Sequence, residues 1–110
     1  MSKDRVFADQ AVGLLLPLGP VRARAMFGGF GIYHEDLMIG LIAYGRLYLK
    51  VDAETKARFR DAGSEPFVYD GKGKPIEMSY WTAPRGTMAE PAALLPWAEL
   101  GLAAARRARK

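Results

Sequence analysis

The first residues whose type and spacing suggest chemistry are Gly28, Gly29 and Gly31. Glycine lets a backbone approach a phosphate closely, so glycine clusters occur in nucleotide-binding loops. A Walker loop also ends in Gly-Lys-Ser/Thr, and a dinucleotide fingerprint stands between a strand and a helix. This cluster instead leads into an apolar run that begins at Phe30. We therefore expect the glycines to form a bulge or sharp bend at the start of a sheet, or a place where another backbone comes close.

Residues suited to metal binding or nucleophilic catalysis are few. The 110-residue chain contains no cysteine and a single histidine, His34, so a zinc site would have to use carboxylates in place of the ligands that zinc prefers. Ser2, Ser64 and Ser79 occur in no G-x-S-x-G context, and the carboxylates have no apolar setting that would raise a pKa. The sequence predicts a protein that is not an enzyme and holds no metal and no cofactor.

Aromatic and basic residues offer a different kind of site, a binding surface on a sheet. The run from Arg46 to Val51 alternates aliphatic residues with Tyr48 and Lys50. Alternation places the two sets on opposite faces of a strand, so one face is core and the other presents an aromatic ring beside a cation. Such a face stacks bases in single-strand binders, or it is a solvated sheet along which a lysine stem lies. The candidate interaction surface consists of Arg24, Phe30, Tyr48, Lys50 and Tyr80.

Positive charge is concentrated at one end of the chain. The formal net charge is +4 and the pI is about 9.6, but four of the sixteen basic residues lie within residues 106–110. Without them, the remaining basic residues equal the twelve acidic ones in number. A terminal basic run complements the dipole at a helix end, or it binds phosphates and releases their counterions. The candidate nucleic-acid tail consists of Arg106, Arg107, Arg109 and Lys110.

Length and composition indicate one globular domain. A chain of 110 residues can bury a single core, and a hydrophobic fraction of 50% with 25% charged residues is average for such domains. No apolar run is long enough to span a bilayer, and the N-terminus lacks the pattern of a signal peptide. We expect a cytoplasmic protein with one domain over residues 1–105 and a basic tail over 106–110.

Periodicity predicts the elements that must position these residues. Helices are expected where apolar residues recur at a spacing of three or four, and strands where they alternate. Asp52 and Gly63 flank a short, mostly solvated helix as its N-cap and its left-handed C-cap residue. The predicted helices cover residues 4–16, 53–62 and a last segment that begins near 91 or as late as 95. The predicted strands cover residues 30–34, 37–43, 46–51, 67–70 and 76–82, the first three of them joined into a meander.

Several pieces of the chain occur in an order that resembles a known family. They are MFGGFGIY at 26–33, LYLKVD at 47–52, GSEPF at 63–67, MSYW at 78–81 and a helix that contains Trp97-Ala98. In this order they resemble the N-terminal domain of the TfoX/Sxy family of bacterial competence regulators, in its stand-alone single-domain form. The resemblance implies an α+β fold in the order α-β-β-β-α-β-β-α, with an antiparallel sheet and the helices packed on one side, as in secretion chaperones.

The same resemblance implies a non-enzymatic regulator that contacts a protein partner in transcription regulation. Two other functions stay open at this point: direct nucleic-acid binding through the basic tail and the Tyr48/Lys50 face, and a small-ligand-binding protein or enzyme of unknown substrate. Pairing into a homodimer through the sheet is a further hypothesis, motivated by the likeness to dimeric chaperones and by the exposed strand edge.

Overall fold

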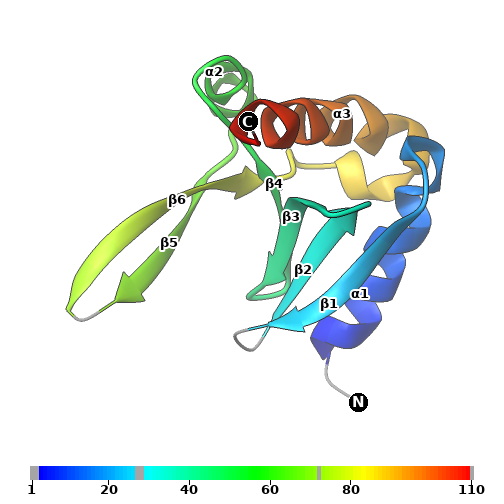
Figure 1. Cartoon of the computed structure of the whole chain (residues 1–110), viewed down its shortest axis with the longest axis horizontal. Helices are drawn as coiled ribbons and strands as arrows, with labels where there is room; N and C mark the ends of the chain where they lie inside the picture. Colours follow the sequence, from blue (N-terminus) through cyan, green and yellow to red (C-terminus); the bar gives the residue numbers. More distant parts are fainter. Residues whose placement is uncertain (1–2, 27–28, 72, 110) are drawn as a thin grey trace.

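One antiparallel sheet organises the described part of this computed structural model, which comprises residues 3–26, 29–71 and 73–109 (Figure 1). Its strands are β1 (Val21–Met26), β2 (Gly29–His34), β3 (Leu37–Ala43), β4 (Arg46–Lys50), β5 (Pro66–Gly71) and β6 (Lys74–Thr82). They lie in the order β1-β2-β3-β4-β6-β5, and each neighbouring pair is antiparallel. The helices are α1 (Lys3–Leu14), α2 (Lys56–Asp61) and α3 (Pro91–Ala108), with short 3₁₀ turns η1 (Leu16–Leu18) and η2 (Thr87–Ala89).

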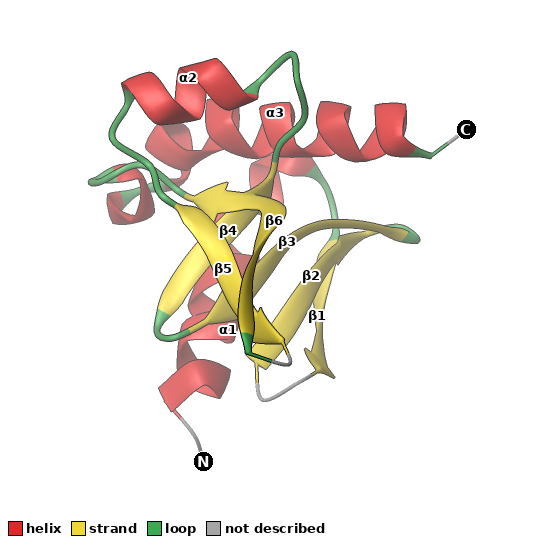
Figure 2. Ribbon diagram, turned by 90° about the vertical axis from the view of Figure 1, so that its left-hand side faces the viewer, coloured by secondary structure: helices red, strands yellow, loops and turns green. Residues whose placement is uncertain are grey.

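Helices cover one face of this sheet. The helix α1 packs against β1, β2 and β3, and α3 packs against β3 and β4. Figure 2 shows the strands in front of α1, and Figure 1 shows the β5–β6 hairpin extending beyond the body of the domain. The predicted α+β fold, an antiparallel sheet with helices packed against it, is confirmed.

The sheet contains one strand more than the sequence predicts. Four strands rather than three separate α1 from α2, because β1 pairs with β2 along its whole length, from Val21 opposite His34 to Met26 opposite Gly29. In β1, small apolar residues alternate with arginines, but alanine and a preceding Pro20 are poor indicators of a strand. This weak local signal explains why the predicted meander was one strand short.

The core lies between the sheet and the helices. The apolar stripe predicted for the first helix packs there, since Ala11 and Leu15 are fully buried. In β4, the alternation is confirmed, because Leu47 and Leu49 both belong to the core, as does Val51 just after the strand. The largest fully buried side chains are those of Leu15, Ile32, Ile39, Ile42, Leu49, Val51, Phe59 and Leu94.

A register shift interrupts the pairing of β2 with β3. Ile32 lies opposite Gly40, whereas Tyr33 lies opposite Met38, so Ile39 is an extra residue in β3. A bulge of this kind allows successive residues to depart from strict alternation. Ile39 is fully buried in the core, while Met38 reaches over Gly31, where an added Cβ would lie 3.4 Å from Cε of Met38.

The short helix α2 ends at a left-handed glycine. Gly63 has a φ of 86°, its N–H donates to the carbonyl oxygen of Arg60 at 3.0 Å, and the N–H of Ser64 donates to that of Phe59 at 3.0 Å. These two bonds form a Schellman motif, so Gly63 is the C-cap residue that the sequence predicts. The helix itself begins at Lys56, later than predicted.

The long helix α3 begins at Pro91, the earlier of the two predicted starts, and it accommodates Pro96 in its interior. It continues to Ala108, so Arg106 and Arg107 lie in its last turn. Among the residues that the structure describes, no helix combines the length and the apolarity that a membrane crossing requires.

Candidate interaction surface

The face of the sheet opposite α1 and α3, which we call the open face, follows from the strand register. Arg24, Gly31, Leu41, Tyr48 and Thr82 stand opposite one another in a row across five strands, and residues paired in this way share a face. Alternation and the β3 bulge extend the row to neighbouring positions. The open face includes Arg22, Arg24, Met26, Gly31, Tyr33, Met38, Leu41, Ala43, Arg46, Tyr48, Lys50, Met78, Tyr80 and Thr82.

Two cations lie over tyrosine rings on the open face. The guanidinium carbon of Arg24 is 5.6 Å from the ring centroid of Tyr33, and Nζ of Lys50 is 5.1 Å from that of Tyr80. Lys50 and Tyr80 are direct neighbours in the β4–β6 pair. A cation–π contact contributes about 0.5–1 kcal/mol at an exposed site. These contacts therefore hold two positive charges at defined positions on the sheet.

The hydroxyl of Tyr80 is a neutral donor. It lies 3.5 Å from the carbonyl oxygen of Met38, which is a long hydrogen bond. The main cause that raises the pKa of Tyr80 is burial of its side chain, and the electrostatic influence of Tyr33 also raises it. The phenol therefore stays protonated at neutral pH, so the open face gains no negative charge from it.

Tyr48 is packed into an aromatic cluster. Its side chain is only 6% exposed, and its ring meets Phe67 edge-on, with centroids 5.1 Å apart and planes at 74°. Phe67 also stacks on Tyr44, with centroids 5.9 Å apart. Tyr48 therefore joins the β5–β6 hairpin to the body of the sheet and offers little ring surface to a ligand.

The structure separates Phe30 from the other predicted interaction residues. Phe30 is 8% exposed and belongs to the core, with the guanidinium of Arg5 5.8 Å from its ring centroid. Arg24, Tyr48 and Lys50 share the open face with Tyr80. Sequence reasoning did not single out Tyr33, Met26, Met38 or Leu41 on that face.

The glycine cluster serves close packing in β2. A Cβ at Gly29 would overlap the carbonyl oxygen of Ile42. A Cβ at Gly31 would stand 2.7 Å from Sδ of Met26 and 3.0 Å from Cε1 of Tyr33, so glycine at this position makes room for side chains of the open face. Gly28 lies outside the described residues.

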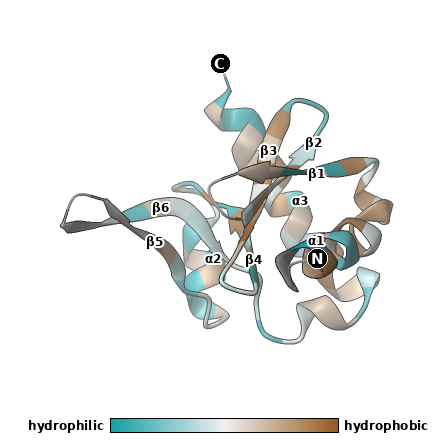
Figure 3. Ribbon diagram, turned by 90° about the horizontal axis from the view of Figure 1, so that it is seen from below, coloured by the Kyte–Doolittle hydropathy of each residue, from teal (hydrophilic) through white to brown (hydrophobic). Residues whose placement is uncertain are grey.

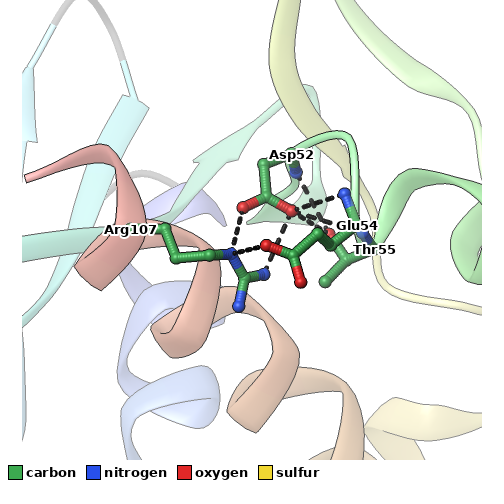
Figure 4. A network of polar contacts seen from close by, with 4 residues as sticks. All are labelled: Asp52, Glu54, Thr55 and Arg107. Carbon is green, nitrogen blue, oxygen red and sulfur yellow. Dashed lines mark hydrogen bonds and ion pairs between the residues drawn. The ribbon is translucent and has the colours of Figure 1, made fainter.

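The end of α3 is joined to the start of α2 by a polar network (Figure 4). Nε of Arg107 donates to Oδ2 of Asp52 at 2.6 Å, and Nη2 donates to Oδ1 at 3.1 Å. Nε of Arg107 also lies 3.0 Å from Oε2 of Glu54. The Asp52 carboxylate accepts backbone N–H bonds from Glu54 and Thr55, so one side chain caps the turn before α2 and binds α3.

Replacing Asp52 with asparagine tests the charge in this network. The hydrogen bond from Arg107, more than any other contact, lowers the pKa of Asp52. A carboxyl with a lowered pKa stabilises the folded state above its unfolded-state pKa, about 3.9, and this stabilisation is lost as the pH falls through the lower folded-state pKa. We expect Asp52→Asn to lower the free energy of unfolding by about 1 kcal/mol at neutral pH and by progressively less in acid.

Urea denaturation at a series of pH values between about 7 and about 3 measures this difference. Asp61→Asn is the control, because Asp61 is exposed and its contact with Arg60 is 3.7 Å long; we expect almost no change at any pH. An effect of Asp52→Asn that is equally large at both ends of the series would contradict the prediction.

The other cations of the predicted tail differ in their contacts. Nη1 of Arg109 lies 2.7 Å from Oδ1 of Asp36, so Arg107 and Arg109 both have acidic partners. Arg106 is exposed and forms no ion pair with a described residue, and Lys110 lies outside the described residues. The last turn of α3 has the hydrophilic colour in Figure 3. The positive charges of Arg107 and Arg109 are nevertheless neutralised by acidic residues of the same chain.

The open face shows the opposite pattern. Within the described residues, Arg22, Arg24 and Lys50 form no ion pair with an acidic side chain, and the open face itself contains no acidic residue. Arg46, at the start of β4 on the same face, does have a partner, since its Nη1 lies 2.8 Å from Oε1 of Glu65, which precedes β5. The unneutralised charge of the sheet is therefore collected on the open face.

A cleft that shares Arg46 and Thr82 with the open face is a second place where a ligand could bind. Its volume is about 380 Å³, at the lower end of the range for small-molecule sites. The pair of Arg46 and Glu65 lies in its wall, with Nη1 of Arg46 2.8 Å from Oε1 of Glu65. The hydrogen bond to Glu65 raises the pKa of Arg46, so the guanidinium stays charged. The cleft is lined by Phe7, Gly45, Arg46, Leu47, Gly63, Glu65, Thr82, Ala83, Pro84, Arg85, Gly86 and Met88.

Comparison with known proteins places the chain in a family. The model of the TfoX N-terminal domain matches residues 13–105. The DNA transformation protein TfoX1 of Aliivibrio fischeri is 37% identical over 78 residues, which are 71% of this chain and 37% of that protein. The aligned part of the chain thus spans little more than a third of its relative. The resemblance predicted from the sequence is confirmed, and the chain belongs to the TfoX N-terminal domain family.

Proposed function

We propose that this chain is a non-enzymatic regulatory module of transcription or competence control, and that it acts by binding a partner protein on the open face. Its relation to a protein named for DNA transformation supports the regulatory role. The main observation in favour of a protein partner is the composition of the open face.

Apolar and amphipathic side chains occupy the middle of the open face. Met26, Met38 and Leu41 are only partly buried, and Met78 is 37% exposed. Methionine adapts its shape to a partner and is frequent on binding surfaces, and arginine and tyrosine are enriched at protein interfaces. A sheet face of this composition supports docking of another folded or folding protein.

Site-specific photo-crosslinking tests this proposal. We expect benzoylphenylalanine in place of Met78 to form a covalent adduct with a protein of the transcription or competence machinery in cells of the organism that encodes the chain. Leu16 is the matched control position, because it is an apolar residue that is 66% exposed and lies in η1, away from the open face. Identical adducts from both positions, or adducts from Leu16 alone, would count against the proposal.

A further inference from the structure

We infer that the partner presents an acidic, amphipathic segment to the open face, and that Arg24 and Lys50 select it. This inference rests on the proposed function, because it names the chemistry of the partner for the same surface. Its basis is the distribution of charge, the spacing of the two cations and the state of the tyrosine rings.

Charge complementarity requires an anionic occupant. The open face carries Arg22, Arg24 and Lys50 without an acidic residue among its members, whereas Arg107 and Arg109 at the end of α3 have acidic partners. Like charges brought together across an interface are unfavourable by several kcal/mol. If a second copy of this chain packed face to face on the open face, its cations would lie against the cations of the first. A second copy is therefore not the favoured occupant.

The spacing of the cations fits a segment about as wide as a helix. Arg24 lies on β1 and Lys50 on β4, three strand spacings apart in the sheet, which corresponds to about 14 Å. Gly31 and Leu41 lie between Arg24 and Tyr48 in the row. Lys50 lies two residues beyond Tyr48 on β4, about 7 Å further along the strand. An α-helix is roughly 10–12 Å across with its side chains, so carboxylates on its two flanks reach the two cations while its apolar side covers the middle.

The cations are held in place before a partner arrives. Arg24 and Lys50 lie over Tyr33 and Tyr80, at 5.6 Å and 5.1 Å from the ring centroids. Ordering a long side chain at an interface otherwise costs about 0.5–1.5 kcal/mol. A carboxylate can approach either cation from the solvent side without separating it from its ring.

The same contacts disfavour single-stranded nucleic acid. Binders of that class need ring faces on which bases stack, but Arg24 and Lys50 already cover the rings of Tyr33 and Tyr80. Tyr48 is 6% exposed and is packed against Phe67. The open face therefore offers positive charge without free stacking platforms, which favours carboxylates on a protein segment over bases.

Selection from a phage-displayed library of random linear peptides tests the inference on the full chain. We expect the enriched peptides to combine Asp and Glu with Leu, Phe or Met, and their affinity to fall with added salt. The double variant Arg24→Glu/Lys50→Glu should bind them roughly tenfold or more weakly.

The control variant Arg58→Glu/Arg106→Glu changes the net charge by the same amount at two exposed cations outside the open face that form no ion pair with a described residue. We expect it to bind the peptides within about twofold of the parent chain. A thermal unfolding curve for each variant establishes that a lost affinity is not lost folding.

The outcomes separate this inference from the proposed function. Enriched peptides that cross-link to position 78 without an excess of Asp and Glu would overturn the acidic partner and leave protein binding at the open face intact. Peptides that cross-link only elsewhere count against both. Binding of an oligo-dT strand by the parent chain but not by the Arg24→Glu/Lys50→Glu variant would show that the occupant of the open face is nucleic acid. A dimer of the parent chain that dissociates in this variant would show that the occupant is a second copy of the chain.

Discussion

Replacing Phe59 with alanine should lower the free energy of unfolding by about 3–5 kcal/mol. Phe59 is fully buried and is the buried side chain of α2. Its ring meets Trp97 of α3 edge-on, with centroids 5.0 Å apart and planes at 70°. The substitution leaves a cavity and removes the contact that joins α2 to α3. Since a domain of this kind is stable by about 5–15 kcal/mol in total, the variant should be only marginally folded.

Denaturant unfolding followed by tryptophan fluorescence measures this loss. Arg58→Ala is the matched control, because Arg58 is the preceding, exposed residue of the same helix, and its effect should stay within about 0.5 kcal/mol. Phe59→Leu keeps most of the volume and should lose about 1–1.5 kcal/mol, which keeps the series measurable if the alanine variant unfolds. A loss below about 1 kcal/mol for Phe59→Ala would show that Phe59 does not join the helices as described.

Replacing Gly101 with leucine should lower the free energy of unfolding by about 2–3 kcal/mol. A Cβ at Gly101 would lie 3.2 Å from the carbonyl oxygen of Ile39 and 3.6 Å from Cβ of Leu49. The helix α3 therefore approaches the backbone of β3 and β4 too closely for a long side chain, which would push the helix away from the sheet. Gly101→Ala should be nearly neutral, because the tight contact offsets a gain in helix propensity of about 1 kcal/mol.

The matched control for Gly101 is the glycine near the end of α1. A Cβ at Gly13 would meet nothing within 4 Å, so Gly13→Leu should leave the protein as stable as before or more stable. Thermal unfolding of the four variants, with both glycines changed to alanine and to leucine, measures the contrast. Equal effects of leucine at the two positions would refute the close approach of α3 to the sheet.

Much of the fold is predictable because its signals are local. The apolar stripe of α1 and the alternation of Leu47, Leu49 and Val51 each lie within a few residues, and Gly63 marks the end of α2 by its φ requirement. Phe59 escaped notice because a six-residue helix is too short to show a stripe. Its charged neighbours made the element look solvated although one ring fixes it to the core.

The binding surface was harder to predict because it depends on distant pairing. The approach of Lys50 to Tyr80 requires β4 to pair with β6, and nothing local in either strand specifies that neighbour. One signal was available: in β2, Phe30 and Ile32 alternate with Gly31 and Tyr33, so strand parity alone separates Phe30 from the open face. The burial of Tyr48 depends on the β5–β6 hairpin, whose Phe67 covers it.

The bulge in β3 determines how the strand responds to a change in its length. Because Ile39 is an extra residue opposite the boundary of Ile32 and Tyr33, the strand holds two phases of alternation, one on each side of the bulge. Loss of Ile39 would leave Gly40 opposite Ile32 and Met38 opposite Tyr33 in a regular ladder, so the buried and exposed sets of β3 would keep their faces. In a strand without a bulge, a shift by one residue exchanges the two faces. The bulge therefore lets β3 absorb a change in length of one residue, and the side chains of the open face keep their positions whether or not the extra residue is present.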